Sequence, residues 1–283
     1  KDVAHLARGF VDQSGVPLVF ADLVCEKGKS PRVKLRQERF RPKPNAGERT
    51  EAAQGEAQKR WVIPVCVNYE GQKGNAPLCT LLENETGEIV LGSAASEGAK
   101  SEPACPSWIY PNAGESGYFR VALPKEQFLG LMKAQDKISA PSRANLLSHA
   151  EALVQKGLLG ADVLPDMMLA LKDSRERLVF EKVLGLLQSF KHTYADDAKT
   201  KAALNSFASS MLLPVAKELG WEAKKDDSED KRILRQQVLG TLSAFSDDAW
   251  LMSEAEKKAE AAIKDPASAD WDLAPLALAI SAR

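Results

Sequence analysis

The sequence predicts a multidomain β + α protein in which an antiparallel β-sandwich is followed by an all-α, HEAT-like superhelical domain. The main observation is a change of period near Pro124: before it apolar and polar residues tend to alternate, and after it apolar residues recur at helical spacing. The chain of 283 residues, 44% of them hydrophobic, is long enough for two ordinary cores. We therefore predict a sandwich domain at 1–123, with a linker-like start at 1–9, and a helical, solenoid-like domain at 124–283.

Six segments before Pro124 are rich in β-branched and apolar residues and are separated by Gly, Pro and Asn, which is typical of strands joined by turns. They span residues 16–25, 32–40, 61–69, 78–83, 87–91 and 117–123. Segment 32–40 alternates most clearly, as expected of a strand with one face in water. The aromatic residues Trp61, Trp108 and Tyr118 lie in or beside these segments and are expected to fill the sandwich core.

After Pro124 the apolar residues follow the helical period. Leu146, Ala150 and Leu153 belong to one apolar stripe, and Gly157 is expected to end that helix. Six further segments show similar stripes, and they span 163–171, 178–190, 204–219, 233–245, 249–263 and 271–280. Helices of this length joined by short loops favour antiparallel pairs stacked as a solenoid.

Composition and charge narrow the class of protein. Lys and Arg number 38 and Asp and Glu 39, so the formal net charge is -1 and no global attraction to nucleic acid or to an acidic membrane surface is expected. No apolar run approaches the roughly 18–20 residues that a membrane span requires. The chain begins with Lys1 rather than Met, so we expect it to be cut from a longer polypeptide whose location this start does not reveal.

Four segments occur in the order and at about the spacing of one known family. They are Asp12-Gln13-Ser14-Gly15-Val16-Pro17, Gln37-Glu38-Arg39-Phe40, Trp61-Val62-Ile63-Pro64-Val65 and residues 107–121, which read Ser-Trp-Ile-Tyr-Pro-Asn-Ala-Gly-Glu-Ser-Gly-Tyr-Phe-Arg-Val. With them the chain resembles the region that follows the catalytic domain in the alanyl/leucyl (membrane alanyl) aminopeptidases, which are gluzincin zinc metallopeptidases. Residues 142–150 resemble the first long helix of that family's terminal domain. The resemblance implies that the helical domain continues beyond Arg283.

The catalytic zinc of that family needs His-Glu-x-x-His on a helix, where two imidazoles one turn apart bind the metal. This chain contains three histidines, His5, His149 and His192, and no such pair. The resemblance therefore implies that zinc and the catalytic residues belong to an upstream catalytic domain of the same polypeptide. This chain is then expected to hold no catalytic residue, metal ligand or cofactor of its own, and to be inactive alone.

What the resemblance implies for function is the non-catalytic C-terminal fragment of a zinc-dependent aminopeptidase, whose parent removes N-terminal residues from peptides. This part would shape and close the substrate cavity. Its partners would be the upstream catalytic domain and peptide substrates, with no nucleic acid. The alternative is a free-standing helical-repeat scaffold that binds a protein partner on a concave face.

Two cations are candidates for contact with a peptide. The resemblance places Lys191 near the position at which relatives that trim long peptides carry a lysine facing the cavity, where it can meet the far carboxylate of the peptide. A lysine there also stabilises a helix C-terminus, and this alternative stays open. Arg143, near the start of a predicted helix, is a candidate either for substrate contact or for an ion pair at the surface or between domains.

All four cysteines, Cys25, Cys66, Cys79 and Cys105, fall in the predicted sandwich. Cys66 and Cys79 flank a connection of 12 residues between two segments that can pair as strands, which is a geometry that a disulfide can close. Cys25 and Cys105 are left as a second pair. Buried free thiols are the alternative. Bridged cysteines would indicate that the parent protein is exported or membrane-associated.

Overall fold

The computed structural model describes residues 3–42, 59–72, 74, 76–92, 104–267 and 269–283. The chain divides into two compact units, Lys1–Ala170 and Leu171–Arg283. Within the described part, every strand lies before residue 123 and the elements after it are helices, so the change of period near Pro124 marks the change from strand to helix. Three α-helices that follow residue 123 belong to the first compact unit together with the strands. The division into domains at 1–123 and 124–283 therefore stays a prediction.

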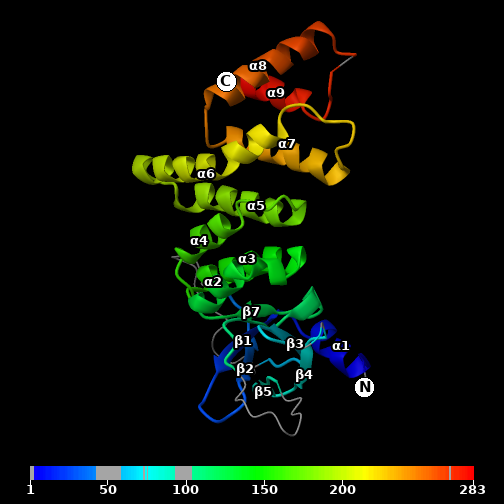
Figure 1. The fold of residues 1–283 in the computed structure, drawn as a ribbon, viewed down its shortest axis with the longest axis vertical. Coiled ribbons are helices and arrows are strands. Elements are labelled where there is room, and N and C mark those ends of the chain that lie inside the picture. Colours follow the sequence, from blue (N-terminus) through cyan, green and yellow to red (C-terminus); the bar gives the residue numbers. More distant parts are fainter. Residues whose placement is uncertain (1–2, 43–58, 73, 75, 93–103, 268) are drawn as a thin grey trace. The chain divides into compact units, whose positions relative to one another are not determined.

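Two sheets make up the strand-rich part of the first unit (Figure 1). The four-stranded sheet has the order β5-β2-β1-β7, formed by Thr86–Val90, Arg32–Arg39, Pro17–Val24 and Arg120–Ala122. The three-stranded sheet has the order β4-β3-β6, formed by Leu78–Leu82, Ile63–Tyr69 and Ile109–Tyr110. Six of these strands overlap the six predicted segments; β6 is the additional one.

The predicted antiparallel arrangement needs a correction at one strand. β1 pairs antiparallel with β2, and β3 pairs antiparallel with β4 and β6, but β7 runs parallel to β1 with Val121 opposite Val19. Parallel neighbours need a long crossover connection, which a tight hairpin cannot provide. The chain between β1 and β7 includes all the other strands, so it supplies that crossover, and β7 returns to the open edge of β1.

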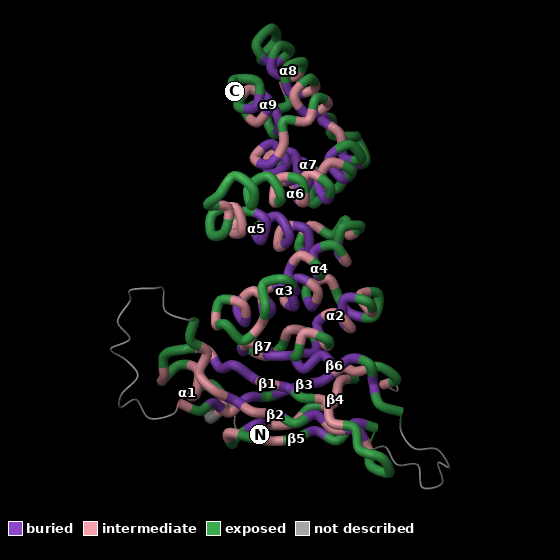
Figure 2. Tube along the Cα trace, turned by 90° about the vertical axis from the view of Figure 1, so that its left-hand side faces the viewer, coloured by how far each residue is buried: buried purple, intermediate pink, exposed green. Residues whose placement is uncertain are grey.

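A buried glutamine connects the two sheets. Figure 2 shows buried segments of β1 and β3 in purple. Along β2 the residues Val33, Leu35 and Gln37 are buried, and the period of two puts all three on one face. Gln37 Nε2 donates to the carbonyl oxygens of Trp61 at 2.8 Å and Asn84 at 2.9 Å, and Gln37 Oε1 accepts from the Trp61 backbone N–H at 2.9 Å. A buried amide is tolerated only when its donors and acceptor are paired. Gln37 therefore joins β2 to the segment that precedes β3 and to the turn that follows β4.

The start of the chain at 1–9, expected to be linker-like, overlaps the helix α1, Val3–Val11. Leu6, Gly9 and Phe10 lie three and four positions apart and are partly buried, so they share one face of the helix. The ring of Phe10 meets the ring of Tyr118 edge to face, with centroids 6.2 Å apart. Tyr118 itself is 69% exposed, so its prediction as a core aromatic is wrong, whereas Trp61 and Trp108 are buried.

Three helices complete the first unit: α2, Lys125–Lys133, α3, Ala140–Lys156, and α4, Val163–Ala170. The Oγ of Ser139 accepts from the Ser142 backbone N–H at 3.3 Å and caps the start of α3. Gly157 ends α3 in the left-handed conformation, with φ of 77°, and this confirms the predicted stop. Leu146, Ala150 and Leu153 are buried, as the apolar stripe predicts.

The second unit contains five helices among its described residues: α5, Arg177–Tyr194, α6, Ala198–Leu219, α7, Glu229–Ser243, α8, Ala249–Lys264, and α9, Ala274–Ser281. α6 and α5 both pack on α7, and α8 packs on α9 (Figure 1). Four helices overlap predicted stripes, although α6 begins at Ala198 rather than 204 and α7 at Glu229 rather than 233. The last begins at Ala274 rather than 271, because Pro275 fits a first helical turn and not the interior of a helix.

None of the helices in the described ranges combines the length and apolar character needed to cross a membrane.

Candidate functional site

The segment that carries the strongest resemblance, 107–121, forms a compact turn held by its own polar groups. Asn112 Oδ1 accepts a hydrogen bond from the Gly117 backbone N–H at 2.9 Å, and Asn112 Nδ2 donates to the Gly117 carbonyl oxygen at 3.1 Å. Between them Gly114 and Glu115 lie in the left-handed region, with φ of 68° and 56°. This conformation is uncommon for a residue with a side chain, so the contacts of Glu115 must compensate for it.

Glu115 connects this turn to α3. Tyr110 Oη donates to Glu115 Oε1, and Asn145 Nδ2 of α3 donates to Glu115 Oε2 at 2.5 Å. Burial, followed by the charge of Glu115, raises the pKa of Tyr110 far above its ordinary value. Tyr110 is therefore a fixed hydrogen-bond donor at neutral pH and not an acid–base group. Sequence reasoning missed this cluster because Glu115 and Asn145 are 30 residues apart and only folding brings them together.

His149 lies inside the first unit, on α3. It is 4% exposed, and its Nδ1 accepts a hydrogen bond from the Val121 backbone N–H at 3.4 Å. Its Nε2 is buried and has no hydrogen-bond partner among the residues that the structure describes. Burial, with a smaller contribution from the positive charge of Arg120, lowers the pKa of His149 to about 3. His149 is thus a neutral core histidine.

This environment makes the stability of the first unit depend on pH. The ordinary pKa of 6.5 applies to His149 in the unfolded chain, whereas in the folded chain it is about 3. Below pH 6.5 the unfolded chain takes up a proton that the folded chain cannot, so His149 lowers the free energy of unfolding by up to about 1.4 kcal/mol for each pH unit. From about one pH unit above 6.5 its contribution is constant, because both states are then neutral.

We expect His149→Gln to remove this slope, since glutamine can accept from Val121 without titrating. Between pH 6.5 and pH 5 the native chain should lose about 2 kcal/mol more stability than His149→Gln, as measured by urea unfolding. His192 is exposed on α5, so His192→Gln is the matched control and should follow the native chain. Parallel curves for His149→Gln and the native chain would contradict the prediction.

Lys191 lies in the last turn of α5 and is partly buried. Its Nζ donates to the carbonyl oxygen of Ala244, the residue that follows α7, and lies 5.0 Å from the centre of the Phe245 ring. A cation at this place satisfies an unpaired carbonyl at the end of a helix. The geometry thus supports a role in the packing of α5 and α7. Contact of Lys191 with a peptide carboxylate remains a prediction.

Arg143 lies in the first turn of α3 and is partly buried. Its backbone N–H donates to the Ser139 carbonyl oxygen at 3.0 Å. Arg143 belongs to the first compact unit and Lys191 to the second. The suggested substrate contact of Arg143 likewise stays a prediction.

The four cysteines form two disulfides, Cys25–Cys105 and Cys66–Cys79. Cys66 and Cys79 stand directly opposite each other on the antiparallel strands β3 and β4, so this disulfide crosses neighbouring strands of one sheet. The other joins the end of β1 to the segment before β6, across 80 residues of sequence. Both therefore stabilise the strand-rich part of the first unit.

The donor groups in the part of the chain that the structure describes do not fit a catalytic zinc ion, which needs about three protein ligands that converge on one point. Among the residues that the structure describes, no group of three or more His, Cys, Asp or Glu side chains is arranged to hold a metal. His149 accepts from the backbone inside the core, His192 is exposed, and the cysteines are bonded to each other. The side chain of His5 lies outside the described residues.

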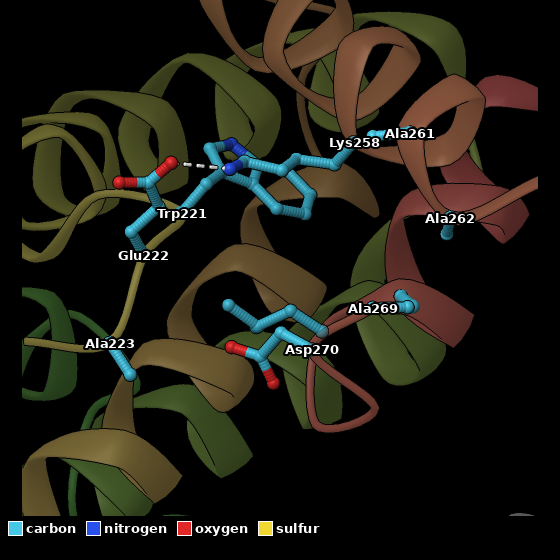
Figure 3. A pocket seen from close by; sticks show the side chains of 10 residues that line it. Trp221, Glu222, Ala223, Lys258, Ala261, Ala262, Ala269 and Asp270 are labelled. Carbon is cyan, nitrogen blue, oxygen red and sulfur yellow. Dashed lines mark hydrogen bonds and ion pairs between the residues drawn. The ribbon is translucent and has the colours of Figure 1, made fainter. Parts of the chain in front are cut away.

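A pocket of about 290 Å³ lies in the second unit (Figure 3). Trp221 and Glu222 line it from the chain after α6, Lys258 lines it from α8, and alanines form much of the rest. Lys258 Nζ donates to Glu222 Oε1 at 2.6 Å, the interaction dashed in Figure 3. Asp270 is the other carboxylate in the lining, so the charged groups of the pocket are one ion pair and one further aspartate.

Residues 108–283 match the family described as the ERAP1-like C-terminal domain. The chain belongs to this family. The resemblance to the C-terminal portion of the alanyl/leucyl aminopeptidases, drawn above from four short segments, is thereby confirmed.

Several aminopeptidases are similar over most of this chain. Aminopeptidase M1 of Arabidopsis thaliana is 25% identical over 273 residues, which cover 93% of this chain and 29% of the plant protein. Aminopeptidase M1-A of Oryza sativa subsp. japonica is 26% identical, over 93% of this chain and 28% of its own length. Endoplasmic reticulum aminopeptidase 1 of Rattus norvegicus is 25% identical, over 84% and 23%. The chain thus spans less than a third of these relatives.

Proposed function

We propose that this chain is the non-catalytic C-terminal part of a zinc-dependent aminopeptidase whose catalytic domain lies upstream in the same polypeptide. The observation that carries the proposal is the match of residues 108–283 to a C-terminal domain family, in a sequence with no His-Glu-x-x-His. The named relatives are aminopeptidases, and this chain corresponds to about a quarter of each. The reaction is then hydrolysis of N-terminal residues from peptides, with the zinc held upstream.

In this proposal the chain has two parts with different tasks. Residues 1–123 form a β-sandwich that spaces the catalytic domain from the helices, and residues 124–283 form a HEAT-like wall that closes over the substrate cavity. Buried alternate residues on β2 and β3 support a core between the two sheets. The Glu115 contacts with Tyr110 and Asn145 support a fixed junction between the sheets and α3.

The wall restricts access rather than performing chemistry. It admits peptides and excludes folded proteins, so the chain takes part in the choice of substrate. Lys191 can meet the far carboxylate of a peptide only if its ammonium group releases or shares the Ala244 carbonyl. An ammonium group has three N–H donors, so sharing is chemically feasible.

We further propose that the chain folds in an oxidising compartment, so that its parent is exported or membrane-associated. Two disulfides among four cysteines support this, because such bonds form and persist in secretory and extracellular environments and are rare in the cytosol.

The purified chain alone is expected to bind no stoichiometric zinc and to release no amino acid from aminoacyl-coumarin substrates. The measurements are metal analysis after incubation with zinc and dialysis, and fluorescence, with a complete zinc aminopeptidase as the positive control. Close to one zinc per chain, together with release that a chelator abolishes, would overturn the non-catalytic assignment.

The reading frame that encodes the chain separates the proposal from its alternative. An open frame that continues upstream of Lys1 and encodes His-Glu-x-x-His supports the aminopeptidase. Translation that starts near Lys1 would instead favour a free-standing helical-repeat scaffold for a protein partner.

A further inference from the structure

The sequence contains one acceptor triplet for N-linked glycosylation, Asn84-Glu85-Thr86. The pattern is Asn-x-Ser/Thr, where x is any residue except proline, and such triplets are modified on the surface of proteins that pass through the secretory pathway. The other asparagines of the chain lack Ser or Thr two positions later. Whether this triplet can carry a glycan therefore depends on where Asn84 lies and on the compartment.

Asn84 lies at the tip of the turn between β4 and β5 and is exposed, as is Thr86. The Asn84 side chain forms no hydrogen bond to any residue in the described ranges, so its amide is not required by the fold. Two hydrogen bonds from Gln37 hold the backbone of the turn. Gln37 Nε2 donates to the Asn84 carbonyl oxygen at 2.9 Å, and the Gln37 backbone N–H donates to the Glu85 carbonyl oxygen at 2.8 Å. The backbone of the turn is thus held, while the residue Asn84 itself is exposed.

Besides the exposure of Asn84, the two disulfides are a second and independent observation in favour of glycosylation. They indicate the oxidising compartment in which N-linked glycans are added in eukaryotic cells. This step rests on the proposed export of the parent protein.

We propose that Asn84 carries an N-linked glycan. In the transfer, the amide nitrogen of Asn84 attacks the anomeric carbon of an oligosaccharide carried on a lipid diphosphate. A C–N bond forms, the C–O bond to the diphosphate breaks, the lipid diphosphate leaves with the bonding electron pair, and the amide proton passes to a base of the transferase. No oxidant or reductant is needed.

The position also gives the glycan a physical effect. In the sheets of the described residues, β4 and β5 are both terminal strands, and the turn that carries Asn84 joins them. Terminal strands present unpaired N–H and C=O groups on which another chain can add as a strand. On β5 the side chain of Val90 is 41% exposed, which adds an apolar surface to that edge. A bulky polar glycan where the two edges meet hinders such pairing.

The test uses the full chain with a secretion signal, expressed in eukaryotic cells, with treatment by a peptide N-glycosidase, an amidase that removes the whole N-linked glycan and converts the asparagine to aspartate. We expect the mass of the native chain to decrease once on treatment. Peptide mapping of the treated chain should find aspartate at position 84. Asn84→Gln and Thr86→Ala should not show this decrease in mass, whereas Thr86→Ser is the matched control and should show it. The unglycosylated variants should aggregate more than Thr86→Ser at equal concentration.

Failure of this inference can be told apart from failure of the proposed compartment. A native chain that has no free thiols after unfolding without reductant, yet has the mass of the bare polypeptide, overturns the glycan proposal alone. A chain that enters the lumen with four free thiols and no glycan overturns both. A glycan that persists in Asn84→Gln also contradicts the assignment to Asn84.

Discussion

Replacing Arg235 with methionine is expected to lower the free energy of unfolding of the second compact unit by about 3–5 kcal/mol, the range for breaking a buried ion pair. The side chains of Arg235 and Asp227 are each 1% exposed. Arg235 donates through Nη2 to Asp227 Oδ2 and through Nε to the Leu219 carbonyl oxygen at 3.0 Å. Methionine would leave Asp227 without its buried partner and the Leu219 carbonyl without its donor.

The charge on Asp227 persists at neutral pH. Its side chain forms an ion pair with Lys231 and accepts hydrogen bonds from the Lys224 backbone N–H and from Arg235, and these contacts hold its pKa well below the ordinary value. Removal of Arg235 therefore leaves a buried carboxylate that only part of its environment compensates. This is the physical reason for a loss larger than that of an ordinary surface substitution.

Urea unfolding followed by circular dichroism measures the effect, and two further variants sharpen it. Lys257→Met breaks a pair with Glu254 in which Lys257 is 66% exposed, so it should change stability by less than about 0.5 kcal/mol. Arg235→Met combined with Asp227→Leu should be more stable than Arg235→Met alone, because no buried charge is left unpaired. An Arg235→Met variant as stable as Lys257→Met would show that the prediction is wrong.

Removal of the disulfide Cys25–Cys105 is the other large effect that we expect. Its cysteines are 80 residues apart, and in the chain-entropy description a loop of that length contributes about 4.5 kcal/mol to stability. For Cys66–Cys79, with a separation of 13, the same description gives about 3 kcal/mol. Cys25 and Cys105 are exposed, so Cys25→Ser with Cys105→Ser opens the loop without leaving a cavity in the core.

The matched control is the double variant Cys66→Ser with Cys79→Ser, which opens the shorter loop. Both variants should unfold at lower urea concentration than the native chain, and the one that opens the longer loop should be the less stable. Titration of the native chain, unfolded without reductant after production in an oxidising compartment, should find no free thiols. Four free thiols, or the reverse order of stability, would contradict this account.

Local pattern predicted most of the secondary structure, because period reports which face of an element is buried. Segment 32–40 alternates in sequence, and β2 buries Val33, Leu35 and Gln37 on one face. The stripe from Leu146 to Leu153 faces the core of its unit, and Gly157 ends the helix. The strand β6 was missed because two residues carry no period. The helix α1 was missed because its partly buried face is short.

The direction of β7 and the exposure of Tyr118 could not be read from local pattern. β7 is parallel to β1 because a long crossover returns the chain to that edge, and nothing in three residues reports such a path. Tyr118 stands at the start of an apolar, strand-like segment, yet its ring packs against the Phe10 ring of α1 and is largely exposed. In both cases the deciding partner is far away in sequence.

The sequence by itself determined the change from strand to helix, the family, the absence of a His-Glu-x-x-His pair and the single glycosylation triplet, since each depends only on residue order. Only the tertiary structure decided which polar groups meet. Gln37 binds the carbonyls of Trp61 and Asn84, and Lys191 binds the carbonyl of Ala244, over separations of 24 to 53 residues. Packing determines these partners, because a buried donor forms its hydrogen bond with the acceptor that the fold brings within hydrogen-bond distance.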